Sequence, residues 1–362
     1  MRIPPTYFAL SHAELLAARH EFAMFTLAAD VRETGIVTPV HDFVPMRGWS
    51  FRRREQFIPL FMPAMSRAIR RYDPDVIHQH FATWSVPATS ASRRGRLPLI
   101  TTLHGADVVM ALARSRTAMQ RWHHRNIAGA QRQSSRFLAV SEYLAGQAVR
   151  AGFDAARIDV HYQGIDTDYY TPAEVTAAKD ARPLIVFVGA LEARKGVRDL
   201  LIASESLGTS REHDLVIIGD GSLRAELTRS AAPNVTVEGS IDRAGVREYL
   251  RHATVLVLPT QETNGWREAA GLVLLEAQAC GTPVITYRSG GAPEMLQEGS
   301  TGLVVPEKDR GALSSALRSI FDLDAGSLSA MRVAARRFVV EQRSLARSAD
   351  ELEQHYAAVS SR

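Results

Sequence analysis

The chain alternates between short apolar runs and segments in which apolar residues recur every three or four positions. The first pattern predicts buried strands and the second predicts amphipathic helices. In the first half, strands are predicted at residues 22–27, 76–80, 99–102 and 137–140, with helices at 11–19 and 142–151. In the second half, strands are predicted at 184–188, 215–218, 235–238, 254–258, 283–286 and 303–305. The helices between them are expected at 197–206, 223–230, 244–251, 272–280 and 310–323.

This alternation indicates parallel α/β architecture. The cycle restarts after 164–183, a polar, proline-containing stretch in which no strand or long helix is predicted. We therefore expect two Rossmann-like doubly wound domains that face each other across a cleft, formed by residues 1–167 and 168–342. Residues 343–362 add a C-terminal helix, predicted at 345–359, for which a crossing back onto the first domain is one option.

The first domain has an unusual opening. A doubly wound domain normally begins with a strand, whereas this chain begins with Met-Arg-Ile-Pro-Pro and enters a predicted helix by about Phe8. The first strand and its turn are therefore expected to be missing or very short. A mis-assigned start or a truncated chain would explain this opening.

The composition is that of a globular protein, with 46% hydrophobic and 23% charged residues among 362. No apolar run approaches the roughly 20 residues that a membrane-spanning helix needs. No secretory signal pattern is visible at the start. The single cysteine, Cys280, cannot form an internal disulfide. These features predict a cytoplasmic location.

Positive charge is concentrated in one arginine-rich stretch near the start. Its arginines alternate with aromatic and aliphatic residues, which allows two interpretations. One is a solvated face over a packed helix; the other is a surface that contacts anionic lipid at the inner face of the cell membrane. Nucleic acid is not an expected partner, because no binding-module signature accompanies the charge. The arginines are Arg47, Arg52, Arg53, Arg54, Arg67, Arg70 and Arg71.

The strongest candidate chemistry is a pair of carboxylates, Glu268 and Glu276, eight positions apart. In one continuous helix they would lie about 12 Å apart, too far to share a proton. We expect Glu268 on a loop, Gly271 near a helix start and Glu276 further along that helix. The helix N-terminus offers amides to a diphosphate, and each carboxylate can accept hydrogen bonds from sugar hydroxyls. Taken singly, either glutamate could be a helix-end charge; together with the glycine they suit a nucleotide sugar.

Two glycine-containing turns follow the first two predicted strands of the second domain. The turn at 189–196 carries Arg194 and Lys195, which are candidates to neutralise phosphate charge at the carboxyl end of a strand. The turn Gly219-Asp-Gly221 is a fragment of a dinucleotide fingerprint, with Arg224 in place of the third glycine. It is weak support for NAD and reasonable support for a tight turn beside a nucleotide.

Histidines follow two predicted strands of the first domain. His104 comes directly after the strand at 99–102 and could donate a hydrogen bond to a sugar; the alternative is a structural histidine at a strand end. His78 and His80 lie on one face of a strand. A metal pair is conceivable, but no further ligands follow at metal-site spacing, so no metal site is expected.

Taken together, these motifs resemble the family 4 glycosyltransferases of GT-B fold over nearly the whole chain. The resemblance rests on Val-Ile-His-Gln-His-Phe-Ala at 76–82, Thr-Leu-His-Gly-Ala-Asp at 102–107 and Val-Ser-Glu-Tyr-Leu at 140–144. It rests further on Gly-Ile-Asp at 164–166, the run 271–284 and Ser-Gly-Gly at 289–291. The stretch 259–265 is similar to members that build bacterial exopolysaccharide and colanic-acid-type glycans.

The resemblance implies retaining transfer of a hexose from a UDP- or GDP-sugar to a glycan or lipid-linked glycan acceptor. The first domain would be the acceptor side and the second would bind the nucleotide sugar. No metal and no cofactor are implied, since the nucleotide sugar is a substrate. The implied catalytic residues are His104, Glu268 and Lys195. The implied donor-binding residues are Arg194, Lys195, Gly221, Glu268, Gly271, Leu272, Val273 and Glu276.

The chain departs from the family pattern in its first domain and beside the donor site. Ala190 stands where the family usually has a phosphate-binding arginine, and Ala269 stands where it usually has glycine. With the unrecognisable opening strand, these departures leave a second hypothesis open, a non-catalytic nucleotide-sugar-binding protein. A Rossmann dehydrogenase is disfavoured, because no complete glycine fingerprint with a following acidic ribose ligand is present.

Overall fold

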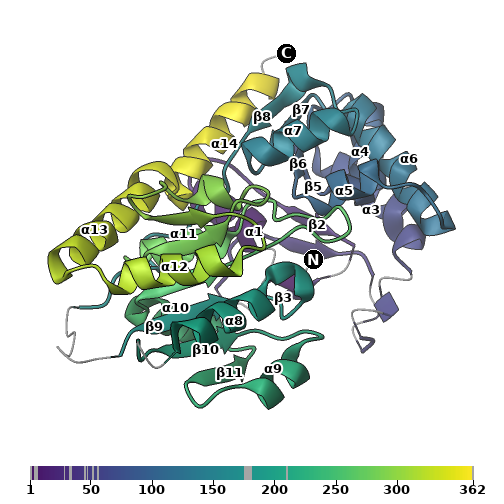
Figure 1. Cartoon of the computed structure of the whole chain (residues 1–362). Coiled ribbons are helices and arrows are strands. Elements are labelled where there is room, and N and C mark those ends of the chain that lie inside the picture. Colours follow the sequence, from purple (N-terminus) through teal and green to yellow (C-terminus); the bar gives the residue numbers. More distant parts are fainter. Residues whose placement is uncertain are drawn as a thin grey trace. The chain divides into compact units, whose positions relative to one another are not determined.

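The computed structural model describes residues 2–3, 7–27, 29–31, 35–44, 46, 48–50, 53–54, 57–174, 182–208 and 211–360. The chain forms two compact units (Figure 1). Unit 1 comprises residues 1–163 and 345–362, and unit 2 comprises residues 164–344. The sequence analysis placed these boundaries after residues 167 and 342.

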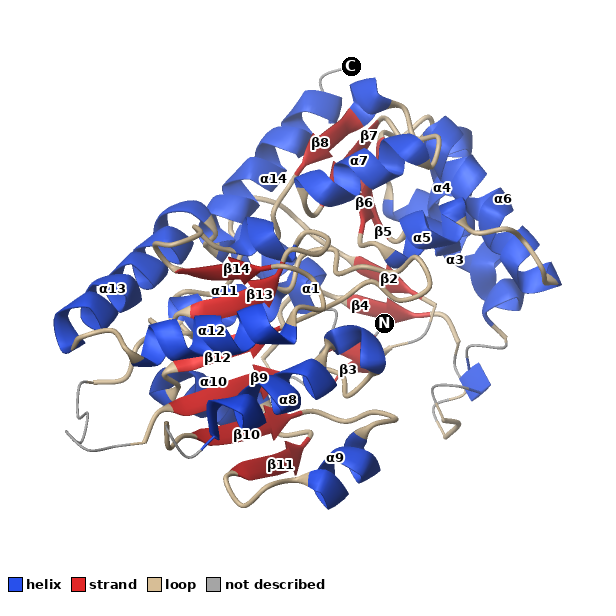
Figure 2. Cartoon of the chain, viewed as in Figure 1, coloured by secondary structure: helices blue, strands red, loops and turns tan. Residues whose placement is uncertain are grey.

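Unit 2 contains a six-stranded sheet in which all neighbouring strands are parallel. The strand order is β11-β10-β9-β12-β13-β14, which is 3-2-1-4-5-6 in chain order, the doubly wound arrangement (Figure 2). The strands are β9 (Leu184–Val188), β10 (Asp214–Ile218), β11 (Val235–Gly239), β12 (Val255–Leu258), β13 (Val284–Tyr287) and β14 (Gly302–Val305).

Helices cover both faces of this sheet, so its central strands are apolar throughout. On one face α8 (Val197–Leu207) packs with α12 (Arg310–Phe321). On the other, α11 (Leu272–Ala279) packs with α10 (Arg243–His252) and α13 (Ala325–Gln342), and α9 (Arg224–Ser230) contacts β11. The sequence analysis did not predict α13, whose apolar residues follow the helical period only weakly.

Unit 1 contains a four-stranded parallel sheet in the order β5-β6-β7-β8 and two smaller parallel pairs, β2-β4 and β1-β3. Strands β4 and β8 were not predicted, because each has only three residues and β4 includes His41 and Asp42. The strands are β1 (Arg2–Ile3), β2 (Met24–Thr26), β3 (Asp30–Val31), β4 (Val40–Asp42), β5 (Ile77–His80), β6 (Leu99–Leu103), β7 (Arg136–Ala139) and β8 (Ile158–Val160).

Helices also cover both faces of the unit 1 sheet. Helices α3 (Ile58–Tyr72) and α4 (Val86–Gly95) share one apolar cluster with Ile77 and Leu99. The C-terminal helix α14 (Leu345–Ser360) packs on the other face, with Ile100 and Leu138 in a second cluster. It thus returns to unit 1. The remaining helices are α1 (Tyr7–Leu16), α5 (Ala106–Leu112), α6 (Ala118–Gln133) and α7 (Glu142–Arg150).

The arginine-rich stretch is not a uniform surface. Arg54 is only 5% exposed and donates to the Ala29 and Val44 carbonyls and the Asp42 carboxylate. Its inclusion in an exposed arginine face was therefore wrong. The other described arginines of the stretch do reach the surface: Arg53, Arg67 and Arg71 are exposed, and Arg70 is partly exposed. Arg47 and Arg52 lie outside the described residues. Among the helices that the structure describes, none has the length and apolar character needed to cross a membrane.

Candidate functional site

The turn after β9 carries the two predicted phosphate ligands of unit 2. Arg194 and Lys195 lie in a single 3₁₀ turn, which ends at Gly196, where α8 begins. Gly196 has φ +70°, and a Cβ there would lie 1.9 Å from the carbonyl oxygen of Pro259, at the end of β12. Glycine is therefore required, because the turn is pressed against the neighbouring strand end.

The turn after β10 is held equally closely against the turn after β9. A Cβ on Gly219, whose φ is +145°, would lie 1.9 Å from the Gly189 carbonyl oxygen. A Cβ on Gly221 would lie 2.5 Å from the carbonyl oxygen of Leu191, which accepts a hydrogen bond from the amide of Leu223 at 2.9 Å. Gly221 thus borders the loop that carries Lys195, and the two turns form one backbone-packed edge of the sheet.

Lys195 and Glu268 form an ion pair between the ammonium Nζ and the carboxylate Oε2. Their side chains are 17% and 13% exposed, so the pair is largely shielded from water. The glycine turn after β13 holds the backbone of Glu268 in place. The amide of Gly291 donates to the Glu268 carbonyl at 2.9 Å, and a Cβ on Gly290 would lie 2.1 Å from the same oxygen.

The ion pair lies beside the N-terminus of α11. Gly271 is the N-cap, with φ +88° and no side-chain cap, and a Cβ on it would lie 3.5 Å from Cγ of Glu268. Leu272 and Val273 form the first helical turn, whose amides have no intrahelical acceptor. Lysine, glutamate and the positive end of the helix therefore converge, an arrangement suited to an anionic ligand with hydroxyl groups.

Glu276 lies in the second turn of α11, about 6 Å along the axis from Leu272. It is adjacent to Tyr170, whose pKa is raised by burial and by the negative charge of Glu276. Arg243 Nε lies 3.4 Å from the Tyr170 hydroxyl. The structure thus places Glu276 on the same helix as Gly271 and next to Tyr170. Sequence analysis did not identify Tyr170 or its neighbour Arg243 as residues of this region.

Cys280 follows Glu276 by one helical turn. It is buried, and burial, followed by the Glu276 charge, raises the pKa of its thiol to about 12. A protonated, buried thiol is a poor nucleophile and a poor metal ligand. Cys280 is therefore a packing residue of this region.

A tryptophan that the sequence analysis missed contacts both cationic residues. The Cζ atom of Arg194 lies 4.3 Å from the ring centroid of Trp266, and Nζ of Lys195 lies 5.4 Å from it. Arg194 Nε also donates to the Glu192 carboxylate at 2.6 Å. These contacts fix the direction of the Arg194 side chain. Because Trp266 lies two residues before the predicted site residue Glu268, its position in the sequence could have marked it as a candidate.

His104 lies in unit 1, at the carboxyl end of β6. Its Nε2 is 3.0 Å from Nδ1 of His80, and its Nδ1 is 3.3 Å from Nε2 of Gln163. The buried carboxylate of Asp107 accepts hydrogen bonds from the amides of His104, Gly105, Val108 and Ala82, at 3.0–3.2 Å. The loop around His104 is therefore held by one carboxylate at the start of α5.

Burial controls the protonation of this histidine group. It lowers the pKa of His104 well below 6.5, and the neighbouring His80 lowers it further. Burial, followed by the charge of His161, lowers the pKa of His80 to about 4. Both imidazoles are neutral at pH 7. A neutral His104 can act as a hydrogen-bond donor or acceptor, and it does not supply a permanent positive charge.

The two nitrogens of His78 are engaged by protein groups. Nδ1 lies 2.8 Å from the Tyr356 hydroxyl and Nε2 lies 2.7 Å from Oγ1 of Thr102. Within the described ranges, histidine, cysteine, aspartate and glutamate side chains form no group of three or more suited to a metal ion. The His78 and His80 pair therefore has a structural explanation, as part of the contact between β5 and α14.

The fold and this arrangement define a class of two-domain, doubly wound proteins in which a lysine, a glutamate and the start of a helix converge in the second domain. Family models match both parts of the chain. The model described as Glycosyltransferase Family 4 matches residues 6–169, and that described as Glycosyl transferases group 1 matches residues 182–322. The chain belongs to the family 4 glycosyltransferases of GT-B fold, as the motifs predicted.

Curated relatives and solved structures agree with this assignment. The chain is 30% identical over 385 residues to a D-inositol 3-phosphate glycosyltransferase of Pseudarthrobacter chlorophenolicus, covering 95% of this chain and 88% of the relative. It is 28% identical over 284 residues to a glycogen synthase of Mycobacterium tuberculosis, with 74% and 65% covered. The chain thus spans less than two thirds of the length of that relative.

A solved structure shows the same fold along almost the whole chain. Anabaena HepE, crystallised with UDP-glucose, matches with a TM-score of 0.77 at 18% sequence identity. The match covers 98% of this chain and 96% of HepE. At this identity the comparison establishes the fold, in agreement with the predicted pair of Rossmann-like domains.

Proposed function

We propose that the chain is a retaining glycosyltransferase that moves a hexose from a UDP- or GDP-sugar to a glycan or lipid-linked glycan, in the synthesis of a cell-surface polysaccharide. The observation that carries the proposal is the Lys195–Glu268 ion pair beside the amide end of α11. A diphosphate at this end would meet a lysine, free amides and a helix dipole. A carboxylate at the same place accepts hydrogen bonds from sugar hydroxyls.

In this proposal each residue has a distinct role. Lys195, with Arg194 nearby, stabilises the charge that develops on the departing diphosphate, usually the largest electrostatic contribution. Glu268 positions the transferred sugar, and Glu276 binds the ribose from the second turn of α11. Leu272 and Val273 contribute backbone amides, and Gly221 binds the donor through the turn that it packs against the loop carrying Lys195. His104 is the residue of unit 1 to which we assign a catalytic role, and the leaving phosphate takes the acceptor's proton on the same face without a metal.

Donor turnover tests this proposal. Purified protein is incubated with UDP- and GDP-hexoses and acceptor extracts, and released nucleotide is measured. We expect Lys195→Ala and Glu268→Gln to lower kcat/KM by about 10²–10³-fold, because each removes a preorganised polar contact. Lys308→Ala is the matched control, because Lys308 is exposed and lies outside this group. Unchanged release in both site variants would disprove the assignment.

A second candidate, a non-catalytic nucleotide-sugar-binding protein, is supported by Ala190 in the β9 turn and by the interrupted sheet of unit 1. It predicts saturable binding of nucleotide by calorimetry and no sugar transferred to any acceptor. Thermal-shift measurements with UDP-, GDP- and ADP-sugars identify the base. Transfer of labelled sugar to any acceptor decides for the enzyme.

We also propose peripheral contact with anionic membrane through α3. Leu60 is 73% exposed on this helix, and Arg67 and Arg71 are exposed on it. Apolar and cationic side chains on one helix suit binding at a lipid interface. Co-sedimentation with phosphatidylglycerol vesicles should exceed that with phosphatidylcholine vesicles and fall in Arg67→Glu/Arg71→Glu. The control is Arg229→Glu on α9 of unit 2; equal sedimentation with both lipids would refute the contact.

A further inference from the structure

Residues 166–170 form a tight turn near the start of unit 2. The Asp166 carboxylate accepts hydrogen bonds from the amides of Asp168 at 3.0 Å and Tyr169 at 2.9 Å. The amide of Tyr170 donates to the Asp166 carbonyl at 3.0 Å. Aspartate closes turns in this way because its short side chain reaches the backbone two residues further on. The turn therefore fixes the backbone position of Tyr170.

Arg336 on α13 joins this turn to α11. Its Nη1 donates to the carbonyl of Tyr170 at 2.6 Å and to that of Ala279, the last residue of α11, at 2.9 Å. Its Nη2 donates to the carbonyl of Thr167 at 2.9 Å. The nitrogens of a guanidinium lie in one rigid plane. The turn is therefore held in one place relative to the helix that carries Glu276.

The side chain of Tyr170 reaches Glu276. The residue is only 2% exposed, and its hydroxyl is hydrogen-bonded to Glu276. Burial, followed by the negative charge of Glu276, raises the pKa of the Tyr170 phenol, so the hydroxyl keeps its proton at neutral pH and donates to the carboxylate. Packing alone does not call for this hydroxyl, since a phenylalanine ring would fill the same buried space.

Arg243 on α10 supports the Tyr170 hydroxyl. Its Nε lies 3.4 Å from the hydroxyl oxygen, which can accept from Arg243 while its proton is donated to Glu276. The Cζ atom of Arg243 lies 4.1 Å from the ring centroid of Tyr169 and 5.2 Å from that of Tyr170. The two rings pack edge to face, with 5.0 Å between their centroids. Arg243, Tyr170 and Glu276 thus form a chain of contacts that ends on α11.

Glu276 has a side chain for which such support matters. It is long, and it is half-buried in the second turn of α11. A glutamate that rotates freely loses rotamer freedom when it binds a ligand, and this loss weakens binding. A hydrogen bond from Tyr170 fixes the carboxylate before the ligand arrives. An ionised carboxylate has two oxygens and about four acceptor positions, so it can accept from Tyr170 and from ligand hydroxyls together.

We propose that Tyr170 is a positioning residue of the donor site, whose hydroxyl orients the Glu276 carboxylate for the ribose hydroxyls of the nucleotide. This role rests on the proposed function, in which Glu276 binds the ribose. It makes the preference for ribose depend on a residue that does not itself touch the nucleotide. Arg243 contributes indirectly, through the Tyr170 oxygen.

Ribose preference tests this role. Calorimetry measures binding of the full chain to UDP, GDP and ADP, and then to the 2′-deoxy and 3′-deoxy forms of the nucleotide that binds most tightly. Tyr170→Phe removes the hydroxyl and keeps the ring. We expect the ribonucleotide to bind about tenfold more weakly to this variant, because the carboxylate loses a hydrogen bond that orients it. Binding of the deoxy form that the parent chain disfavours should change by less than about twofold.

Two further measurements separate positioning from a structural role. Glu276→Gln should show the same loss of ribose preference, and the double variant with Tyr170→Phe should lose no more, because both changes remove one contact. In turnover, Tyr170→Phe should raise KM for the donor and leave kcat unchanged. The ratio of two ligands on one protein does not depend on the folded fraction, so lost stability cannot imitate the result.

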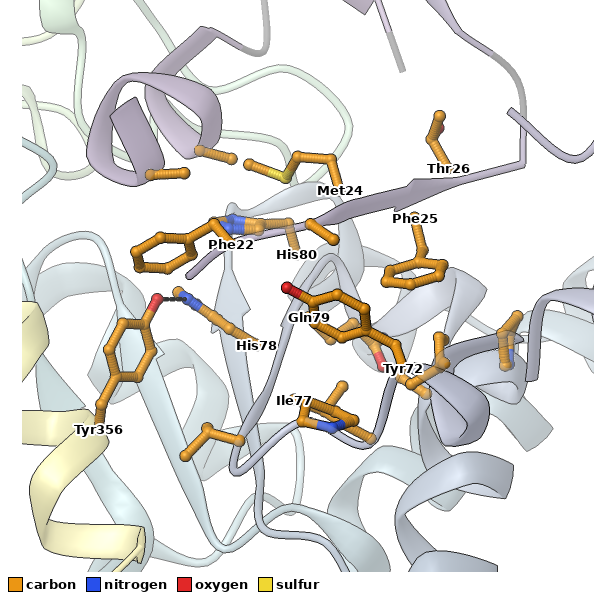
Figure 3. Close-up of a pocket in the computed structure, with 18 of the residues that line it drawn as sticks. Phe22, Met24, Phe25, Thr26, Tyr72, Ile77, His78, Gln79, His80 and Tyr356 are labelled. Carbon is orange, nitrogen blue, oxygen red and sulfur yellow. Dashed lines mark hydrogen bonds between the residues drawn. The ribbon is translucent and has the colours of Figure 1, made fainter. Parts of the chain in front are cut away.

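Two tyrosines outside this group provide matched controls. Tyr249 on α10 donates to Glu238 at 2.7 Å, so Tyr249→Phe removes another tyrosine–glutamate hydrogen bond of unit 2. Tyr356 lines a cavity of about 1060 Å³ in unit 1, where its hydroxyl is hydrogen-bonded to Nδ1 of His78 at 2.8 Å (Figure 3). Tyr249→Phe and Tyr356→Phe should both keep the ribose preference of the parent chain.

The outcomes distinguish this role from the proposed function. If the parent chain binds none of the three nucleotides, the proposed function is overturned, and the role of Tyr170 with it. Equal binding of the ribose and deoxy forms by the parent chain would overturn the assignment of Glu276 to the ribose and the dependent role of Tyr170. A parent preference for ribose that Tyr170→Phe retains, or an equal weakening of both forms in this variant, would overturn the role of Tyr170 alone.

Discussion

Units 1 and 2 follow the same alternation of strand and helix, yet their sheets differ at the central position. In unit 2, β9 lies between β10 and β12, and Ile185, Val186 and Phe187 are fully buried. In unit 1, a cavity separates β2 from β5, and at least three separate apolar clusters surround the sheet. The two sheets therefore differ in how the strands beside the central position are paired. In unit 2, β9 is paired on both edges, whereas in unit 1 each of β2 and β5 is paired with one strand among the described residues.

The difference extends to the candidate site residues of each unit. Lys195 and Glu268 lie on loops that leave a complete sheet and are fixed by close glycine contacts of the backbone. His104 lies at the end of β6 and is held mainly by Asp107, His80 and Gln163. Rigid backbone packing therefore supports the unit 2 residues, whereas polar side-chain contacts support the unit 1 residue.

The largest expected effect compares one phenylalanine from each unit. Phe187→Ala removes a fully buried ring from β9 and should lower the free energy of unfolding by about 3–5 kcal/mol. Phe25→Ala removes a partly exposed ring that lines the cavity and should cost less than about 2 kcal/mol. Denaturant melts, with hydrogen exchange assigning the effect to each unit, measure both. Equal losses would contradict the difference in packing between the units.

A smaller effect is expected from the glycine turns of unit 2. Gly196→Ala places a methyl group against the Pro259 carbonyl and should lower the free energy of unfolding by at least about 2 kcal/mol. It should also weaken donor binding, because Lys195 precedes it. Gly299→Ala is the control, since Gly299 in unit 2 also has a positive φ, +78°, with no atom within 4 Å of a Cβ. Calorimetry with UDP- and GDP-sugars measures binding, and similar losses in both variants would contradict the role of close packing.

The smallest effect, counted for a change of one pH unit, is the acid sensitivity expected in unit 1. Burial, followed by the charges of His161 and His80, lowers the pKa of His12 from 6.5 to about 3. Between pH 6.5 and 3 the unfolded chain therefore binds more protons at His12 than the folded chain does. The contribution of His12 to the free energy of unfolding is fully present above pH 6.5 and is lost as the pH falls toward 3. The slope is about 1.4 kcal/mol per pH unit for each such histidine.

His12→Gln tests this expectation, because glutamine can keep a hydrogen bond to Ser348 without titrating. Its melts between pH 4.5 and 7 should show a shallower fall of stability with acid than the parent chain. His252→Gln, at an exposed position of unit 2, is the control and should leave the slope unchanged. An unchanged slope in His12→Gln would show that His12 does not contribute to acid sensitivity.

The fold could be predicted largely because strands of a sheet covered on both faces are continuous apolar runs. The predicted strand at 184–188 has the bounds of β9, and the predicted helix at 345–359 is close to α14. Short strands such as β4 could not be predicted, because three residues that include His41 and Asp42 carry no apolar run. Helix α13 was missed because its burial depends on contact with α11, which periodicity does not reveal.

Candidate site residues could be predicted where a charged side chain lies in a glycine turn or just before a helix that begins at glycine. Lysine in a glycine turn, and glutamate before a glycine-capped helix, mark both partners of the observed ion pair. The roles of Trp266 and Tyr170 could not be found in this way, because aromatic residues have many uses and their neighbours come from distant segments. The burial of Arg54 was also hidden, since a run of arginines carries no signal for the carbonyl groups that surround one of them.

The return of α14 to unit 1 makes that unit discontinuous in sequence, while unit 2 is one uninterrupted segment. The amide of Ile165 donates to the Arg343 carbonyl at 2.8 Å, so both ends of unit 2 lie side by side, as in an inserted domain. A gene fragment encoding 164–344 can therefore be excised as a single piece. A fragment that stops at residue 163 would lack Leu352 and Tyr356, which pack in the hydrophobic cluster around Ile100 and Leu138. One side of its hydrophobic core would therefore be missing.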